Sequence, residues 1–325
     1  MNARRLSFSL WLLTSAAVLY AATLEGPRLG LVFDPAAKAL RPILGIPGAA
    51  TFGTPLELGL DLRKIAISPM QDYVLATEGE HNQVVVLAAG HTPMTPVAIH
   101  GADRGPDQII LSSGGQAAAL YHKDRNRIQV VSGLPGAPRV SEELLLSAGR
   151  VLSALAVGDD GKTVLAGIED SVYWVSPSGE VPILTGLHKI ASITLASDHT
   201  ALVADNAGNQ IHRVKDVTGV AAADVVAGSK EGISAPVAVA ISHDNRRAFV
   251  ANGKSGTITI LDLHGKTGAT KLACGCKPTG LSRLAGDDVF RLTDPSNRPM
   301  WVLEAAAHQS RIVFVPAALT GSNHK

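Results

Sequence analysis

The chain has few cysteines, few aromatic residues and little net charge, and each shortage excludes a class of protein. Cys274 and Cys276 are the only cysteines among 325 residues, and one residue separates them, so a disulfide framework joining distant segments is excluded. The formal net charge is +1 and no basic stripe is present, which argues against nucleic acid as a partner. Aromatic residues make up 4% of the chain, too few for a sugar cleft lined with rings.

Common catalytic motifs are also missing. The sequence contains no G-x-S-x-G, H-E-x-x-H, P-loop or G-x-G-x-x-G pattern. Its histidines are spread along the chain without the spacing of metal ligands, and turn or surface positions explain them. The sequence therefore leaves the existence of any enzymatic activity open and favours a non-enzymatic protein.

The first 22 residues have the order of an export signal. Residues 1–5 are basic and residues 6–22 are apolar and uncharged. Small residues at Ser15 and Ala17 allow cleavage there but leave a short apolar region, and near Ala21 and Ala22 the residue three positions back is bulky. We therefore expect an exported protein, periplasmic or extracellular, with residues 1–22 as a signal peptide or as a retained N-terminal anchor.

No cysteine follows this run, so a lipoprotein anchor is excluded, and no second apolar segment is long enough to span a membrane.

An internal repeat of about 43 residues organises the rest of the chain. Six apolar segments end at corresponding positions 38 to 46 residues apart, at Ser68, Ser112, Gly158, Ala196, Ser242 and Leu284. Each is followed by a polar turn and by three further short apolar segments, which predicts four strands per repeat. No helical periodicity continues for more than a few residues after the signal.

Four short strands in about 43 residues are typical of one blade of a β-propeller. We predict an all-β, seven-bladed propeller, with residues 23–64 as the additional blade and residues 23–320 as one domain before a polar tail, residues 321–325. Pairing of N-terminal strands with C-terminal ones, such as residues 311–315, would close the ring and remove two exposed edges. Six blades with an extra N-terminal hairpin is the alternative.

One repeat resembles a known family. The segment VAISHDNRRAFVANGKSGTITILDL, residues 239–263, resembles the YVTN type of propeller repeat, with Ala248 to Asn252 in the YVAN position. The resemblance is specific in this copy and degraded in the others. It implies an exported bacterial propeller of the YVTN or NHL-like kind, and it says little about chemistry.

Candidate binding residues lie in the loops expected on one face of the propeller, because loops on a rigid scaffold often carry function. The polar residues selected there are Asp103, Arg104, Asp124, Arg125, Glu169, Asp170, Asn206, Asn252 and Lys254. Turn formation is the alternative explanation for each of them. A ring of Asp, Glu and Asn could bind Ca²⁺, but basic residues interleave with these acids, so no cofactor is the main expectation.

The function predicted from these patterns is a protein-binding or scaffolding module, monomeric, that recognises a protein or peptide partner in the cell envelope. The alternative is a metal-dependent lactonase-like hydrolase or lyase with a divalent ion in the central channel. Cys274 and Cys276 could be buried thiols, a local disulfide, or a metal or redox site, and the sequence does not decide among them.

Overall fold

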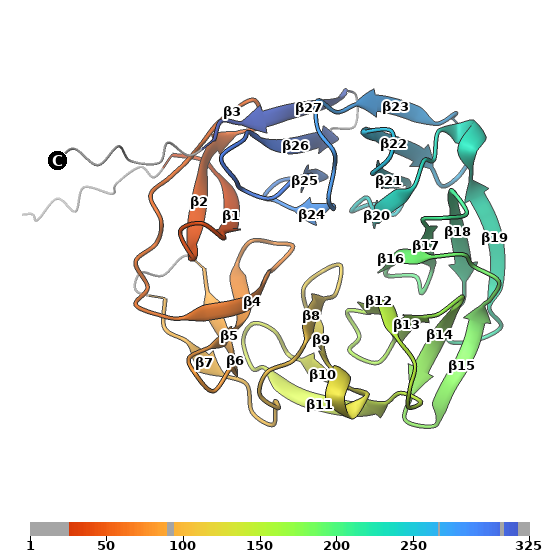
Figure 1. The fold of residues 1–325 in the computed structure, drawn as a ribbon, viewed down its shortest axis with the longest axis horizontal. Helices are drawn as coiled ribbons and strands as arrows, with labels where there is room; N and C mark the ends of the chain where they lie inside the picture. Colours follow the sequence, from red (N-terminus) through yellow and green to blue (C-terminus); the bar gives the residue numbers. More distant parts are fainter. Residues whose placement is uncertain (1–25, 90–93, 266, 306–308, 318–325) are drawn as a thin grey trace, which may run out of the picture.

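The computed structural model describes residues 26–89, 94–265, 267–305 and 309–317, and these form seven antiparallel blades around a central channel (Figure 1). The predicted signal or anchor, residues 1–22, and the predicted tail, residues 321–325, lie outside the described residues. We number the blades 1 to 7 in chain order. The predicted seven-bladed, all-β fold is confirmed.

Blades 2 to 7 each contain four strands in sequence order from the channel to the rim. The innermost strands are β4 (Leu62–Ile67), β8 (Gln108–Leu111), β12 (Leu152–Val157), β16 (Ile190–Leu195), β20 (Pro236–Ile241) and β24 (Ser282–Arg283). The second strands are β5 (Tyr73–Glu78), β9 (Ala117–His122), β13 (Val164–Ile168), β17 (Ala201–Asp205), β21 (Arg247–Asn252) and β25 (Val289–Arg291).

The third strands are β6 (Gln83–Ala88), β10 (Arg127–Ser132), β14 (Ser171–Ser176), β18 (Gln210–Lys215), β22 (Thr257–Asp262) and β26 (Met300–Ala305). The outer strands are β7 (Val97–Ala98), β11 (Arg139–Leu145), β15 (Gly179–Leu184), β19 (Ala222–Ala227), β23 (Thr270–Ala273) and β27 (Ser310–Val315). Two short 3₁₀ turns, η1 (Lys123–Arg125) and η2 (Ser229–Glu231), lie in loops.

Blade 1 differs from the others. Its described strands are β1 (Arg28–Asp34), β2 (Ala39–Ile46) and β3 (Ala49–Phe52), in that order. The turn after Asp34 corresponds to the turns between second and third strands elsewhere, so β1, β2 and β3 occupy the second, third and outer positions. The backbone amide of Ala285, at the end of the innermost strand of blade 7, donates to Leu29 O at 2.8 Å, which places the start of β1 at the same face as the ends of the innermost strands.

The predicted pairing of N-terminal with C-terminal strands is corrected by this topology. Strand β27, which contains residues 311–315, pairs with β26 in blade 7, and β3 lies beside it at the rim without entering its sheet (Figure 1). Side chains close the ring instead, because Leu29 and Ile43 of blade 1 pack against Met300 and Val302 of blade 7. Face-to-face burial thus replaces a shared sheet at this junction.

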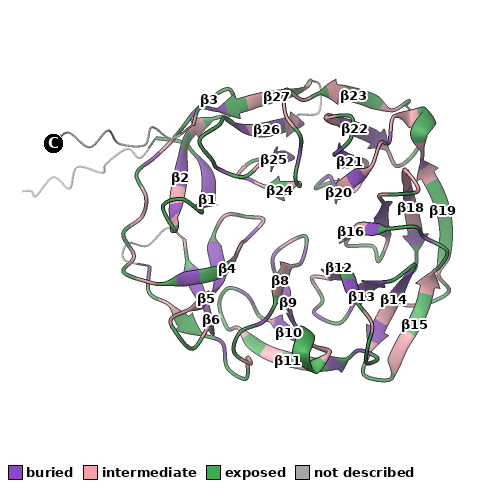
Figure 2. Ribbon diagram, viewed as in Figure 1, coloured by how far each residue is buried: buried purple, intermediate pink, exposed green. Residues whose placement is uncertain are grey.

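Apolar packing between neighbouring blades forms the core. Seven clusters of buried residues are present, one at each of the seven interfaces around the ring. β-branched residues and leucine fill the second and third strands, which are buried on both faces, whereas the outer strands β11 and β23 are partly exposed (Figure 2). Burial of apolar surface against two neighbours stabilises each blade, which could not bury both faces alone.

A serine at the end of the innermost strand organises the turn to the second strand in three blades. Ser68 Oγ accepts from the amides of Asp72 and Tyr73 at 3.0 and 3.2 Å, and Ser242 Oγ accepts from Arg246 and Arg247 at 3.1 and 2.9 Å. Ser112 Oγ accepts from Ala117 at 3.1 Å. These bonds satisfy turn amides that the ladder leaves free, which explains the serine at this position in blades 2, 3 and 6.

The molecule has two faces that matter for the site. The first face carries the turns from innermost to second strands. The second face carries the turns from second to third strands and the connections between blades. Within the described residues, no helix is long and apolar enough to cross a membrane.

Candidate functional site

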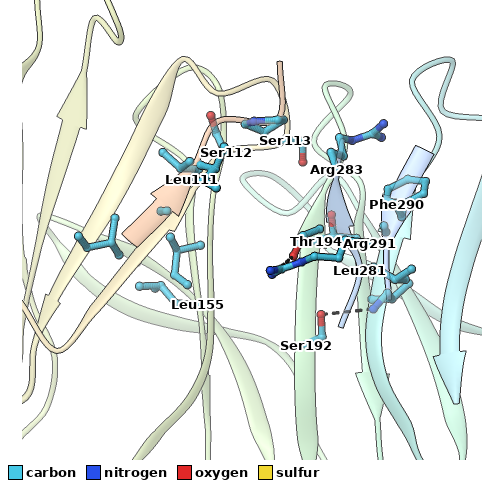
Figure 3. Close-up of a pocket in the computed structure, with 18 of the residues that line it drawn as sticks. Leu111, Ser112, Ser113, Leu155, Ser192, Thr194, Leu281, Arg283, Phe290 and Arg291 are labelled. Atoms are coloured by element: carbon cyan, nitrogen blue, oxygen red, sulfur yellow. Dashed lines mark hydrogen bonds between the residues drawn. The ribbon is translucent and has the colours of Figure 1, made fainter. Parts of the chain in front are cut away.

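The central channel of the propeller is the candidate site. It encloses about 530 Å³ and is lined by the innermost strands of blades 2 to 7 and by β1 of blade 1 (Figure 3). Most of its wall is aliphatic, as Leu111 and Leu155 illustrate. Hydroxyl groups interrupt the aliphatic wall, at Ser112, Ser113, Ser153, Ser192, Thr194 and Ser282.

Blade 7 supplies all of the charge in this lining, in the form of two arginines, Arg283 and Arg291. No carboxylate and no imidazole belongs to the residues that line the cavity in the described part of the chain. Arginine presents five N–H donors and no acceptor, so the channel combines apolar surface with donors suited to an anionic group.

Arg291 reaches into the channel because β24, the innermost strand of its blade, contains only two residues. Figure 3 shows its guanidinium extending from β25 into the pocket. Nη2 donates to Ser282 Oγ at 3.2 Å, and Nη1 lies 3.0 Å from the carboxylate of Asp294. Burial lowers the pKa of Arg291 and the carboxylate of Asp294 opposes that shift, but the side chain stays a cation at any working pH.

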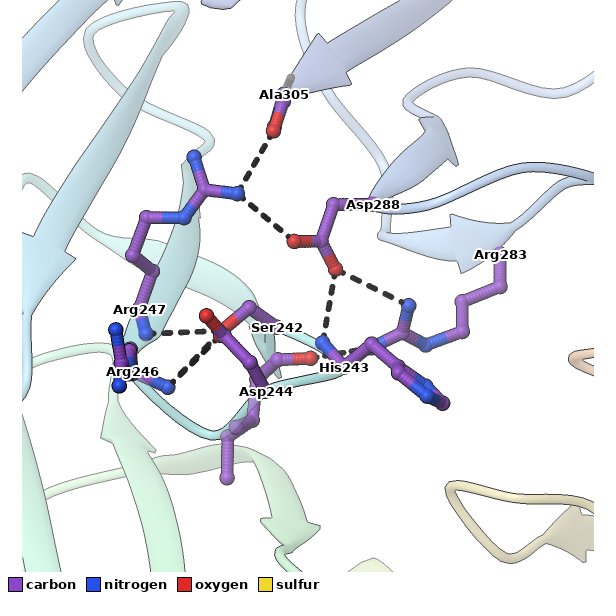
Figure 4. Close-up of polar contacts among 9 residues, drawn as sticks. Ser242, His243, Asp244, Arg246, Arg247, Arg283, Asp288 and Ala305 are labelled. Atoms are coloured by element: carbon purple, nitrogen blue, oxygen red, sulfur yellow. Dashed lines mark hydrogen bonds and ion pairs between the residues drawn. The ribbon is translucent and has the colours of Figure 1, made fainter. Parts of the chain in front are cut away.

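Arg283 instead serves the structure of the first face. It forms an ion pair with Asp288 at 3.4 Å and a short hydrogen bond with Ile241 O, and its guanidinium lies 4.9 Å from the Phe290 ring centroid. Asp288 also binds Arg247 at 2.9 Å and accepts from the His243 amide at 3.0 Å (Figure 4). The carboxylate of Asp288 is 7% exposed, so this network is a buried latch between blades 6 and 7.

A second hollow, of about 540 Å³, widens the channel at the first face. Asp159, His243 and Asp287 are its ionisable residues besides Arg283. Asp159 accepts from the Gly114 amide at 2.9 and 3.1 Å, so its carboxylate holds the loop of blade 3 in place. Ser113 Oγ donates to Leu195 O at 2.6 Å and ties blade 3 to blade 5.

The predicted candidates lie on the second face, and none of the nine belongs to the lining of the channel. Blade 3 brings four of them together: Asp103, Arg104, Asp124 and Arg125. Arg104, Asp124 and Arg125 line a hollow of about 480 Å³ on this face. Asp103 forms an ion pair with Arg125 at 2.9 Å and also contacts Arg127, so its carboxylate has a structural role.

The other five candidates are distributed over three blades. Glu169 and Asp170 are exposed in the turn of blade 4, where Glu169 has a φ of 55° and Asp170 accepts from Ser171 Oγ. Asn206 donates to Pro236 O at 3.0 Å, and Lys254 is exposed. Asn252 is fully buried. Its side-chain oxygen accepts from Ser234 N and its side-chain nitrogen donates to Thr259 Oγ1, so it joins the loop before β20 to strand β22.

The sequence did contain a signal for the residues that prediction missed. Arg283 interrupts LSRL, where the innermost strands of other repeats read IAIS or VAIS, and Arg291 interrupts VFRLT among second strands that are apolar elsewhere. A cation in an otherwise apolar repeat position marks the blade that differs chemically from the others.

The cysteine pair lies on the second face. A disulfide joins Cys274 and Cys276 in a bend after β23, with the Cα atoms 4.9 Å apart. A Cβ on Gly275 would lie 2.7 Å from the Trp301 ring, so the bend packs directly on this indole. Within the described residues, no group of three or more His, Cys, Asp or Glu side chains is placed to hold a metal ion.

No family model and no curated protein matches the chain. Solved structures do match it, and they are β-propellers. Virginiamycin B lyase from Staphylococcus aureus is similar with a TM-score of 0.56 and 15% identity over 79% of this chain and 85% of that one. A functionally unknown protein from Desulfotomaculum acetoxidans is similar with a TM-score of 0.59 and 14% identity over 89% of this chain and 99% of that one.

A putative 6-phosphogluconolactonase from Bacteroides uniformis is similar with a TM-score of 0.56 and 13% identity over 90% of this chain and 97% of that one. At these identities the similarity establishes the fold alone.

Proposed function

We propose that this protein is an exported, non-enzymatic binding protein of the YVTN-like kind, and that its central channel holds an acidic group of a protein or peptide partner. One observation carries the proposal. The charged side chains that line the apolar channel are both arginines, and Arg291 extends into the cavity. This location replaces the loop residues on the second face as the place where a partner is recognised.

Arg291 suits an acidic ligand for a physical reason. Its present counter-ion, Asp294, is 62% exposed, whereas the Arg291 side chain is 22% exposed. A partially desolvated guanidinium binds a carboxylate more strongly than an exposed one does, because water competes less for its donors. A carboxylate entering the channel can therefore replace Asp294 and gain the adjacent hydroxyl of Ser282 as well.

The metal-dependent hydrolase or lyase is the second candidate, because the neighbouring structures include a lyase and a protein named as a lactonase. The donor set of this channel does not fit its metal. Ca²⁺ takes six to eight oxygen ligands, usually with several carboxylates, whereas the charged residues of this lining are cationic and would repel the ion. We therefore derive no catalytic step through a metal.

A binding measurement on matched variants tests the proposal. The probes are an Asp- and Glu-rich decapeptide, a Lys-rich decapeptide, and Ca²⁺ followed by EDTA, each added during a thermal melt. A ligand at a hundredfold excess over its Kd stabilises the folded state by about 2.7 kcal/mol. We expect a shift with the acidic peptide, its loss in Arg291→Gln, and its retention in Arg298→Gln, which changes an exposed arginine in the loop that follows β25.

Two results would count against the proposal. An acidic-peptide shift of equal size in both variants would move binding away from the channel. A Ca²⁺ shift that EDTA reverses, without any response to the acidic peptide, would favour the metal-dependent enzyme and call for a screen of lactone and ester substrates.

A further inference from the structure

We propose that the ligand of the central channel is an extended peptide segment carrying charges of both signs, with an acidic side chain at Arg291 and a basic side chain about four residues away at Asp287. The acidic group at Arg291 rests on the proposed function, whereas the second charge and its spacing are new. Three features of the molecule support such a ligand: two adjoining cavities, a separation of charge along them, and an apolar wall between their ends.

The channel and the hollow at the first face form one continuous space. The cavity of about 530 Å³ and the hollow of about 540 Å³ share lining residues from blades 2, 3, 6 and 7, namely Pro69, Ser113, Ile241, Arg283 and Leu284. The channel therefore opens directly into the hollow, and one extended ligand can occupy both.

Charge is separated along this space. Arg291 is the last residue of β25 and pairs with Ser282, the first residue of β24, which places it toward the second face. Asp159 and Asp287 lie in the turns from innermost to second strands of blades 4 and 7, and they line the hollow at the first face. Among the described residues that line the channel itself, none is acidic. An acid and a base on one ligand would thus find partners at different ends.

The carboxylate of Asp287 is available to a cation. It has no hydrogen bond or ion pair among the described residues, and the residue is exposed where it lines the hollow. Arg283, the arginine of this hollow, has Asp288 as its counter-ion at 3.4 Å. Asp159 accepts from the Gly114 amide and adds a second negative charge at this end.

The wall between the two ends is apolar. Aliphatic side chains of five blades line it, namely Ile67, Leu111, Leu155, Ile193 and Ile241. Apolar residues between the two charges of a peptide would be buried against this wall, which favours binding. A charge placed midway would lose its hydration without gaining a partner, so the wall selects for charges at the ends.

Strand β25 fixes the spacing of the two charges. Asp287 precedes the strand by two residues and Arg291 ends it, so four steps of extended backbone, at most about 13 Å, separate them. An extended peptide covers the same distance with four steps of its own. An acidic residue at position i and a basic residue at i+4 therefore match the channel, whereas adjacent side chains of an extended chain point to opposite sides rather than to opposite ends.

The test uses pentapeptides with blocked ends, so that only side chains carry charge. Glu-Val-Ser-Val-Lys presents both charges at the proposed spacing, Glu-Val-Ser-Val-Gln presents the acid alone, and Glu-Lys-Val-Ser-Val has the composition of the first with adjacent charges. Dissociation constants are measured by titration calorimetry on the full chain at about pH 8, where imidazole is ordinarily uncharged.

We expect the first peptide to bind about two- to fivefold more tightly than the other two, which is the gain of a partly exposed ion pair. Asp287→Asn should remove this gain without changing the Kd of the acid-only peptide. Asp198→Asn, which changes an exposed carboxylate of the first face outside the hollow, should keep the gain. Arg291→Gln should weaken the binding of all three peptides.

Reversal of the charge at the first face gives a sharper result. In Asp287→Lys, Glu-Val-Ser-Val-Glu should bind more tightly than Glu-Val-Ser-Val-Lys, which is the opposite of the order expected in the unaltered protein. An unchanged order would show that the fifth residue of the peptide does not lie at Asp287.

The outcomes distinguish this ligand from the simpler one of the proposed function. Binding of the acid-only peptide that Arg291→Gln abolishes, with no gain from lysine at either position, overturns the second charge and leaves the proposed function standing. An equal gain from both positions of lysine overturns the spacing, and a gain that survives Asp287→Asn overturns the site. Absence of binding by all three peptides overturns both, because the acidic group at Arg291 is common to them.

Discussion

At the first face, the contacts that join blades 2 to 5 to one another differ in chemistry from those that join blade 6 to blade 7. Blades 2 to 5 are joined by hydrogen bonds to backbone groups: Tyr73 to Gly115 O, Asp159 to Gly114 N, and Ser113 to Leu195 O. Blades 6 and 7 are joined by buried ion pairs, in which Asp288 binds Arg247 and Arg283.

This difference follows from how the ring closes. In blades 2 to 7, the residue after the innermost strand donates a backbone hydrogen bond to the start of the second strand, as Ser242 N does to Arg247 O and Leu284 N does to Val289 O. Blade 7 differs in having an innermost strand of only two residues, and within residues 26–89 its neighbour blade 1 begins with the strand in the second position. Arg247 and Arg283 join blades 6 and 7 through Asp288, beside this short innermost strand. The same short strand leaves room for Arg291 to extend into the channel.

The largest expected effect comes from removing the charge at the ion-pair latch. Asp288→Asn keeps the size of the side chain but removes the carboxylate that the partly buried Arg247 and Arg283 share. Breaking a buried ion pair in this way costs about 3–5 kcal/mol of the free energy of unfolding. Urea denaturation measures this loss, and Asp287→Asn, which changes the exposed neighbouring residue, is the control.

The control should lie within about 0.5 kcal/mol of the wild type. Equal stability of the two variants would show that the ion pairs do not hold blades 6 and 7 together.

A smaller effect is expected in the other half of the ring. Tyr73 is 1% exposed and donates to Gly115 O at 2.6 Å, which joins blade 2 to blade 3. Burial raises the pKa of Tyr73, so its hydroxyl remains a donor across the working pH range. Tyr73→Phe removes the bond and leaves a carbonyl unsatisfied, at a cost of about 1–3 kcal/mol.

The comparison variant is Tyr121→Phe. Tyr121 is similarly buried, at 4%, but its hydroxyl has no hydrogen-bond partner in the described part of the chain. Denaturation of both variants isolates the tie between blades 2 and 3, and an equal loss in the two would assign the effect of Tyr73→Phe to packing rather than to the hydrogen bond.

The repeat made the fold predictable, because strand length, turn residues and spacing recur six times and agree with one another. Each of the four segments predicted in those repeats corresponds to a strand of the structure. The closure was less predictable, because the pairing of residues 311–315 depends on which edge is free, and that edge is set by blade 1 and not by local sequence.

Asn252 was predicted as an exposed binding residue, but its side chain is buried in the structure. Asparagine in a turn suggested an exposed ligand, but the same residue type also bridges loops, and only burial distinguishes these roles. Asp103, Arg104, Asp124 and Arg125 do lie near one another in blade 3, as adjacent loops of one blade must. Arg291 was not selected because solvent-facing loops were preferred to strand positions, although its interruption of an apolar segment was visible.

The smallest expected effect is a pH dependence of stability that distinguishes blades 3 and 5 from blades 6 and 7. His122 in blade 3 and His212 in blade 5 have pKa values lowered mainly by burial, and the Nε2 atom of each is buried without a hydrogen-bond partner among the described residues. Their folded-state pKa lies below the unfolded value of about 6.5. The unfolded chain therefore takes up protons first, so stability is complete above about pH 6.5 and falls as the pH drops below it.

Because His122 and His212 lie in blades 3 and 5, mild acid should weaken these blades selectively. Hydrogen exchange at about pH 7.5 and 5.5, corrected for the intrinsic rates, should show lost protection in β9 and β18 but not in β21 and β25. His122→Gln with His212→Gln should flatten the pH dependence of the free energy of unfolding in that interval, whatever its effect on stability at neutral pH. A pH dependence that survives both substitutions would have to come from other groups, and the two halves would then differ in their contacts but not in their response to acid.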